Sequence, residues 1–437
     1  MVVPLCYDFF GGLPALERSA PARAGPHFTQ SVCVDMSEHE KPEPSSRSQK
    51  IPPFLVMDVL EEAQRLEATG ERVVHLEIGE PDFDTPEVVK QAAIEAIARG
   101  ETRYTHSQGL IELREAIAAH YRERYGVTID PDRIIVTSGT SPALFLALSA
   151  ILEPGDEVVI SDPSYSCYAN MIEFCGGRVV RVPVFDEEGY QLDVERVRAA
   201  LTPRTRALFI NSPANPTGTT LSRQTLAALA ELTAERGLAL LSDEIYHGLI
   251  YEGDEVSALE VAPDAFVFNG FSKAYAMTGW RLGYVIAPDA FKRPLQKMQQ
   301  NLFICAANFV QRAGLAALRA ASPAVASMRA EYDRRRRFLA PELRRLGFSI
   351  ETMPQGAFYV FAGYRSLPGA HGLDLKAISS VEFAHLLLHE AGVAVAPGID
   401  FGHQGEGYIR FSYAASLEEL EEAVRRIDRW LSERATG

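Results

Sequence analysis

Cysteine is scarce in this sequence, and long hydrophobic runs are absent. Five cysteines occur in 437 residues, with no C-x-x-C pair, and an odd number in a long chain argues against a disulfide framework. We therefore expect a reducing compartment, the cytoplasm, and no metal site. The longest apolar run, residues 143–152, is far shorter than the roughly 20 residues that a membrane span requires. Neither a membrane span nor a secretory signal is expected.

Positive charge is also in short supply. The formal net charge is −15 at pH 7 and the isoelectric point is near 5.2, so the chain lacks the basic surface that a nucleic-acid backbone attracts. The one dense basic run, residues 334–337, falls in a segment with helical spacing. We expect this run to be a solvated helix face or an interdomain contact rather than an anion site. Nucleic acid is therefore not an expected partner.

Lysine is the rarer of the two strongly basic residues. Of 43 lysines and arginines, the lysines are only Lys41, Lys50, Lys90, Lys273, Lys292, Lys297 and Lys376. Lys273 alone follows an apolar, strand-like run, residues 265–268, inside a glycine- and aromatic-rich segment. Burial among apolar groups lowers the pKa of a lysine, because it disfavours the charged form, and the neutral amine can then attack a carbonyl. The segment predicts Schiff-base chemistry, with a surface loop lysine as the plainer alternative.

The pattern of short β-rich and helical runs predicts the fold. The composition, with 47% hydrophobic and 23% charged residues, is that of a globular protein, and the length of 437 residues predicts two or three domains. From residue 133 onward strand-like runs alternate with helical ones, which predicts an α/β fold with a mostly parallel sheet sandwiched by helices. The seven runs are residues 134–136, 157–161, 179–184, 207–210, 238–241, 265–268 and 282–286. After residue 322 the pattern predicts a smaller α+β domain, with strands at 357–361 and 407–413.

Polar groups follow several of these strand-like runs, at the sheet edge where ligands gather in α/β proteins. Residues 137–141, Thr-Ser-Gly-Thr-Ser, precede a helical run and suit a phosphate, although Ser and Thr also cap ordinary helices. Residues 211–218, Asn-Ser-Pro-Ala-Asn-Pro-Thr-Gly, predict turns. Asp243 closes an apolar strand, and a desolvated carboxylate there requires either several hydrogen-bond donors or a cation, such as a protonated pyridine ring. Arg281 could pair bidentately with phosphate.

Taken together, these motifs resemble those of a known family. Ser-x-Ala-Asn-Pro-Thr-Gly, from Ser212, and Phe-Ser-Lys-Ala-Tyr-Ala-Met-Thr-Gly-Trp-Arg-Leu-Gly-Tyr, from Phe271, are specific. Over roughly residues 50–435 the chain resembles the class I/II aminotransferases of fold-type I, which depend on pyridoxal 5'-phosphate (PLP). The resemblance implies a ping-pong transfer of an amino group between an L-amino acid and a 2-oxo acid. It also implies a homodimer.

The resemblance assigns a role to each motif residue. Lys273 would hold PLP as a Schiff base and move a proton between the substrate Cα and the cofactor. Asp243 would pair with the pyridine nitrogen, and Tyr165 would stack on the ring. The other implied cofactor contacts are Asn215 and Tyr246 to the phenolic oxygen, Gly139, Thr140, Ser141, Ser272 and Arg281 to the phosphate, and Tyr104 to the phosphate of a partner subunit. The implied substrate contacts are Gly79, Asn215 and Arg410, of which Arg410 would clamp the α-carboxylate.

Plainer interpretations of some of these residues stay open. Tyr104 and Tyr165 could be core aromatics, and Arg410 could be a structural ion-pair partner. The chain also departs from its relatives at two positions. Gly270 stands where many of them have a phosphate-binding serine, so Ser272 and backbone N–H groups would have to serve. Ser141 stands where relatives that prefer acidic substrates often have a lysine, which weakens the case for aspartate because a desolvated distal carboxylate needs a cation.

The resemblance leaves the substrate side chain and part of the chemistry open. A carbon–sulfur β-lyase or a decarboxylase would share every cofactor motif, although Arg410 favours reactions that keep the carboxylate. A PLP-sensing transcription regulator is a remote alternative, because it would need a basic DNA-binding domain ahead of the core. The expected organisation is a flexible N-terminal extension at 1–48, the N-terminal part of a small domain at 49–84, a large PLP-binding domain at 85–325 and the rest of the small domain at 326–437.

Overall fold

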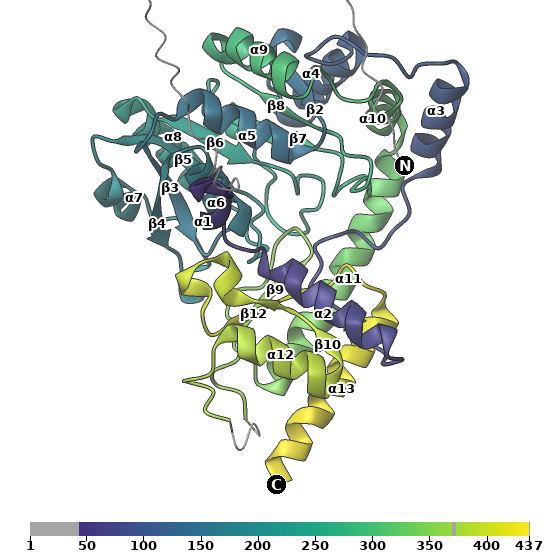
Figure 1. Ribbon diagram of the computed structural model, residues 1–437, viewed down its shortest axis with the longest axis vertical. Helices are drawn as coiled ribbons and strands as arrows, with labels where there is room; N and C mark the ends of the chain where they lie inside the picture. The colour runs from purple at the N-terminus through teal and green to yellow at the C-terminus, as the bar shows by residue number, and fades with distance from the viewer. Residues whose placement is uncertain (1–42, 369–372, 437) are drawn as a thin grey trace, which may run out of the picture. The chain divides into compact units, whose positions relative to one another are not determined.

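The computed structural model describes residues 43–368 and 373–436, and the chain separates into two compact units, residues 1–49 and 50–437. In the part of the first unit that the structure describes, the short helix α1 (Ser46–Lys50) begins. Residues 1–42 of the expected N-terminal extension lie outside the described residues. The three sheets of the described residues and the helices from α2 (Leu55–Ala68) onward belong to the second unit, and Figure 1 shows the described residues in colour.

A seven-stranded sheet forms the centre of the second unit, as expected. Its spatial order is β2-β8-β7-β6-β5-β3-β4, and only β8 runs antiparallel to its neighbours. The strands are β2 (Ile134–Thr137), β3 (Glu157–Asp162), β4 (Arg178–Pro183), β5 (Thr205–Asn211), β6 (Ala239–Asp243), β7 (Phe266–Gly270) and β8 (Gly283–Ile286). All seven strand-like runs of the sequence become these strands. The mostly parallel α/β fold is therefore confirmed.

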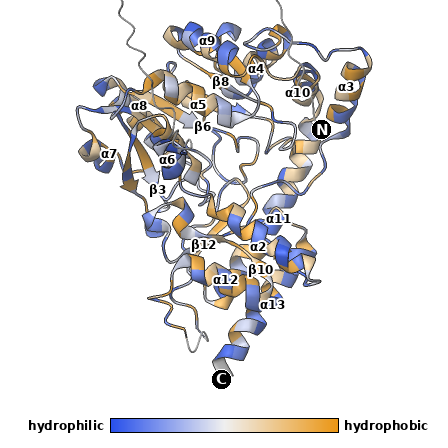
Figure 2. Ribbon diagram, viewed as in Figure 1, coloured by the Kyte–Doolittle hydropathy of each residue, from blue (hydrophilic) through white to orange (hydrophobic). Residues whose placement is uncertain are grey.

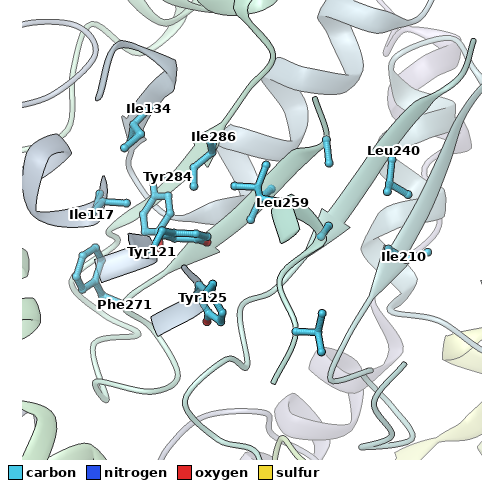
Figure 3. Packing of buried hydrophobic residues seen from close by; sticks show 14 of the residues in the cluster. Ile117, Tyr121, Tyr125, Ile134, Ile210, Leu240, Leu259, Phe271, Tyr284 and Ile286 are labelled. Atoms are coloured by element: carbon cyan, nitrogen blue, oxygen red, sulfur yellow. The ribbon is translucent and has the colours of Figure 1, made fainter. Parts of the chain in front are cut away.

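Both faces of this sheet are buried, which explains why its strands are apolar at nearly every position. Successive residues of a strand point to opposite faces. Val267 packs in one core cluster, whereas its neighbours Phe266 and Phe268 pack in another. Figure 3 shows the first cluster, where Tyr121 of helix α4 (Ile111–Tyr125) lies against Tyr284 of β8. Helices therefore have to cover the sheet on both sides.

The covering helices begin and end where the sequence indicates. Helix α8 (Arg223–Arg236) begins after Ser222, whose Oγ accepts a hydrogen bond from the Thr225 N–H at 3.0 Å, and ends at Gly237, which has a left-handed backbone. Helix α5 (Thr140–Ile151) is mostly hydrophobic along its length in Figure 2, because it packs between the sheet and helices α6 and α9. The remaining helices before residue 322 are α2 (Leu55–Ala68), α3 (Glu87–Ala98), α4 (Ile111–Tyr125), α6 (Ser166–Phe174), α7 (Val194–Ala200), α9 (Lys292–Leu302) and α10 (Asn308–Ala320).

A second core forms around a smaller sheet from the C-terminal third of the chain. Strand β12 (Tyr408–Ser412) lies antiparallel between β11 (Ala396–Pro397) and β9 (Tyr359–Gly363). Helices α11 (Ser322–Leu346), α12 (Ser380–Ala391) and α13 (Leu417–Thr436) pack on it. The pair β1 (Val74–His75) and β10 (Val393–Ala394) joins the segment after α2 to this region. The expected domain boundaries at 84/85 and 325/326 stay predictions.

The basic run at residues 334–337 lies in α11, and only two of its four arginines face solvent. Arg334 and Arg337 are exposed, but Arg335 and Arg336 are 5% and 0% exposed. Arg335 pairs with Asp82 at 2.7 Å and Arg336 with Glu252 at 2.6 Å. A buried arginine requires such partners, so these two side chains join α11 to distant segments. Within the described residues, no helix is both long and apolar enough to cross a membrane.

One glycine of β8 allows the sheet to touch the loop before α5. A Cβ placed on Gly283 would lie 2.7 Å from the carbonyl carbon of Gly139 and from the backbone nitrogen of Thr140. We expect Gly283→Ala to lower the free energy of unfolding by about 1–3 kcal/mol, because the backbone would have to move. Denaturant unfolding measures this. The matched control is Gly279→Ala, since a Cβ there meets nothing within 4 Å, and a loss as large in the control would contradict the prediction.

Candidate active site

A cavity of about 300 Å³ lies at the carboxyl edge of the central sheet. Eleven of the thirteen predicted site residues line it: Gly79, Thr140, Ser141, Tyr165, Asn215, Asp243, Tyr246, Ser272, Lys273, Arg281 and Arg410. Gly139 is not among the lining residues but adjoins them, because a Cβ on it would lie 2.5 Å from Nη2 of Arg281. Tyr104 is 79% exposed and lies outside the cavity. The structure thus brings together residues that span more than 330 positions of the sequence.

Lys273 stands in the turn that follows β7, with its amine in the cavity. Its Nζ donates a hydrogen bond to the Gly79 carbonyl oxygen at 2.6 Å. Burial lowers the pKa of Lys273 to about 8, and the nearby charges of Arg410 and Arg281 act in the same direction, against Glu80. At neutral pH an appreciable fraction of such an amine is neutral. That fraction is the nucleophilic one.

Asp243 ends β6 and is almost completely buried. The Tyr168 hydroxyl donates to its Oδ2 at 2.8 Å, and the Ile245 N–H donates to its Oδ1 at 3.0 Å. Burial nevertheless raises the pKa of Asp243 to about 6, since two donors only partly replace its hydration. A cationic or protonated partner in the cavity would stabilise this carboxylate further.

Arg410 enters the cavity from β12 of the smaller sheet. Its Nη1 donates to Oδ1 of Asn215 at 2.9 Å, and its Nη2 donates to the Glu77 carbonyl oxygen. The guanidinium carbon lies 4.4 Å from the ring centre of Tyr359 and 4.9 Å from that of Phe401. These contacts hold a buried cation in one orientation. Within the described residues, Nε of Arg410 is buried and has no hydrogen-bond partner.

The opposite end of the cavity is suited to an anion. Thr140 and Ser141 form the first turn of α5, where backbone N–H groups have no partner within the helix. Gly139, at the N-cap position, has a φ of 94°, which favours glycine. Arg281 lies against it and has a φ of 55°, and its Nη1 donates to the Thr278 carbonyl oxygen at 3.0 Å. A guanidinium beside a helix N-terminus is a site for a phosphate.

Four tyrosines among the described residues line the cavity. Tyr165 and Tyr246 were predicted from the sequence, whereas Tyr168 and Tyr359 were not. The Tyr246 hydroxyl lies 2.8 Å from that of Tyr359, and the Tyr165 and Tyr168 rings pack edge to face with centres 5.3 Å apart. Tyr168 and Tyr359 carry no motif of their own. The spacing of Tyr168, three positions after Tyr165 on α6, places the two on one helix face and is the only signal that could have indicated it.

Further lining residues received no site role from the sequence, although two of them, Ile78 and Glu80, flank the predicted Gly79. Glu80 accepts a hydrogen bond from the Thr278 hydroxyl, and its charge acts on Lys273. An apolar part of the wall consists of Phe54, Val56, Met57, Ile78 and Leu144. Their sequence pattern is that of ordinary core residues, so only the folded chain shows them at the cavity.

The family Aminotransferase class I and II matches residues 71–427, which is most of the chain. The chain belongs to this family. Within the residues that the structure describes, no group of three or more His, Cys, Asp and Glu side chains could hold a metal in this aminotransferase.

Individual relatives and solved structures agree with the family. The (5-formylfuran-3-yl)methyl phosphate transaminase of Methanocaldococcus jannaschii is 44% identical over 87% of this chain and 97% of its own length. The aspartate/prephenate aminotransferase of Thermus thermophilus is 43% identical over 89% and 98%. The structure of the aspartate aminotransferase from Thermus thermophilus with maleate aligns with a TM-score of 0.83 and 42% identity, over 89% of this chain and 100% of that one. The aminotransferase therefore acts on amino and 2-oxo acids.

The lowered pKa of Lys273 can be tested directly. In cofactor-free aminotransferase, we expect the reaction of Lys273 with an amine-acylating reagent to rise with pH about a midpoint near 8, because only the neutral amine reacts. Lys90 is the internal control, since the hydrogen bond that its ammonium donates to Glu87 raises its pKa. Mass spectrometry of labelled peptides at a series of pH values measures both. Superimposable profiles for the two lysines would contradict the prediction.

Proposed function

We propose that this aminotransferase binds PLP at the cavity and transfers an amino group from an L-amino acid to a 2-oxo acid by a ping-pong mechanism, with Lys273 as its catalytic residue. One observation carries the proposal. The Lys273 amine, the Asp243 carboxylate and the Arg410 guanidinium border the same cavity. They are a nucleophile, a partner for a protonated ring and a clamp for a carboxylate.

The residues present fit PLP. A protonated ring nitrogen would supply the cation that the buried Asp243 carboxylate requires, and the Lys273 amine suits an aldehyde. The phosphate would occupy the first turn of α5 beside Arg281, with Gly139, Thr140, Ser141 and Ser272 around it. Tyr165 would stack on the ring, and Asn215 and Tyr246 would bind the phenolic oxygen. When bound, PLP supplies an electron sink for the electrons that remain when the Cα–H bond breaks.

The chain's own groups would then position the substrate and move the proton. Arg410 would bind the α-carboxylate through its guanidinium, whose orientation Tyr359 and Phe401 already restrict. Nζ of Lys273 would take the proton from the substrate Cα and deliver it to the cofactor. Gly79 would lie over the substrate. A Cβ placed on Gly79 would clash with the Tyr359 hydroxyl, so no larger residue fits there. Retention of the carboxylate by Arg410 favours transamination over decarboxylation.

We also propose a homodimer in the cytoplasm, in which Tyr104 reaches the cofactor phosphate of the partner subunit. The exposure of Tyr104 supports this proposal. The Thr105 N–H donates to Sγ of Cys305 at 3.4 Å, so Tyr104 adjoins the segment that contains Ile304, which is 47% exposed. Neighbouring exposed apolar side chains are typical of an interface.

The role of Lys273 is tested by Lys273→Ala. We expect the variant to lose the borohydride-stable attachment of PLP and at least about 10³ in kcat, because it lacks both the nucleophile and the proton acceptor. Absorbance of the bound cofactor, peptide mapping and a screen of amino donors measure these effects. Lys297→Ala on helix α9 is the surface control. Wild-type turnover by Lys273→Ala, or attachment of PLP at another lysine, would contradict the assignment.

The role of Arg410 is tested by Arg410→Lys. A lysine offers a point charge where arginine offers two parallel N–H donors, so we expect KM for the amino donor to rise about 10- to 100-fold with a smaller change in kcat. The control is Arg425→Lys, at a side chain that is 59% exposed on α13. Steady-state kinetics with the cofactor absorbance recorded in parallel measures the effect. An unchanged KM would show that Arg410 is only structural.

A further inference from the structure

Helix α2 begins beside the active-site cavity. Phe54, Val56 and Met57, at its first turn, all line the cavity. The first N–H groups of a helix need acceptors from outside it. Phe54, at the N-cap position, makes no side-chain hydrogen bond to them. The start of α2 therefore depends on an acceptor from another part of the chain.

That acceptor is Asp400, which is 345 residues further along the chain. Its Oδ1 accepts a hydrogen bond from the Leu55 N–H at 3.2 Å. A carboxylate at a helix N-terminus satisfies unpaired donors and interacts favourably with the helix dipole. Asp400 thus caps α2 from a distant segment, in place of a local side chain.

The turn that carries Asp400, residues Gly398–Phe401, is itself fixed in place. The Ile399 N–H donates to Oγ of Ser380 at 3.1 Å, and the Phe401 carbonyl accepts from the Ser164 N–H at 2.8 Å. The ring of Phe401 packs against the Arg410 guanidinium, with 4.9 Å between the ring centre and Cζ. One turn therefore sets both the carboxylate clamp and the start of α2.

The charges of the cavity indicate what the α2 wall would contact. Among the described lining residues, the only basic side chains are Lys273, Arg281 and Arg410. The proposed function assigns each of these to the cofactor or to the α-carboxylate. Among the cavity residues of this chain, a second carboxylate on the substrate would lose hydration without gaining a cation. The wall of Phe54, Val56 and Met57 instead offers apolar surface.

We infer that Asp400 is a positioning residue that fixes the first turn of α2, so that Phe54, Val56 and Met57 form the subsite for an apolar amino-acid side chain. This inference rests on the proposed transamination at Lys273. It predicts that the wild-type protein uses leucine and phenylalanine as amino donors better than aspartate. Alanine, whose methyl group is too short to use the whole wall, serves as the internal reference.

The experiment compares leucine and alanine as amino donors. In Asp400→Ala we expect the ratio of kcat/KM for leucine to that for alanine to fall about tenfold, the size of effect that loss of one helix cap produces. The change should lie in KM for leucine, with kcat and the cofactor absorbance preserved. Asp400→Asn keeps an acceptor oxygen and should stay within about threefold of wild type, which is the rescue expected of a cap.

Two further variants separate positioning from a general loss of stability. Asp193 caps α7 in the same way, since its Oδ1 accepts from the Arg196 N–H at 2.7 Å, so Asp193→Ala should lower stability similarly and leave the donor ratio unchanged. Met57 is 42% exposed, so Met57→Ala should fold and lower the ratio by itself. Its effect should shrink in the Asp400→Ala background, because both changes act on the same wall. If Asp400→Ala does not fold, Met57→Ala alone tests whether this wall forms the subsite.

Three results would overturn the inference. They are an unchanged leucine-to-alanine ratio in Asp400→Ala, an equal loss for both donors, and a wild-type preference for aspartate over leucine. The proposed function fails differently: wild-type protein that retains PLP at Lys273 but transaminates no donor would contradict it. The two failures are therefore distinguishable with the same set of proteins.

Discussion

The dehydration of three charged groups in one cavity is the constraint on which the rest of the structure depends. Asp243 and Arg410 are almost completely buried and Lys273 is partly buried, and a buried charge is tolerated only with partners in fixed positions. Asp243 has the Tyr168 hydroxyl and the Ile245 N–H, and Arg410 has Asn215 and the Glu77 carbonyl. Each partner comes from a different segment, so the site exists only in the assembled fold.

The seven-stranded central sheet and the three-stranded sheet together position these groups. The central sheet supplies Asp243 at the end of β6 and the turn of Lys273 after β7, whereas β12 of the smaller sheet supplies Arg410. The bond from Arg410 to Asn215 joins the two. Asn215 is in turn held by its N–H, which donates to Oδ1 of Asn211 at the end of β5. A substrate carboxylate on Arg410 would therefore be placed relative to the central sheet by a chain of hydrogen bonds and not by one side chain.

The sequence predicted the strands and the motif residues because both leave local signals. Val267 and its neighbours are apolar in succession because both faces of the sheet are covered, and Lys273 stands in a specific motif. The contacts that complete the site leave no such signal. Tyr359 resembles any core tyrosine, and Asp400 contacts α2 across 345 residues, which only the packing of distant elements determines. Arg336 was expected either on a solvated face or in an interdomain contact, and the sequence could not decide between them, since Glu252 is its partner only after folding.

The opposite pKa shifts of Lys273 and Asp243 explain how such a site can favour its ligand. Between about pH 8 and 10.5 the unfolded chain binds a proton at Lys273 that the folded chain does not, so the contribution of Lys273 to stability rises with pH there. Between 3.8 and about 6 the folded chain keeps a proton on Asp243 that the unfolded chain has lost, so the contribution of Asp243 falls as pH rises. From about pH 6 to 8 both groups are mostly charged in the fold, and both reduce its stability. A ligand that brings a cation to Asp243 and converts the Lys273 amine into a covalent bond removes both penalties, and its binding then stabilises the folded state.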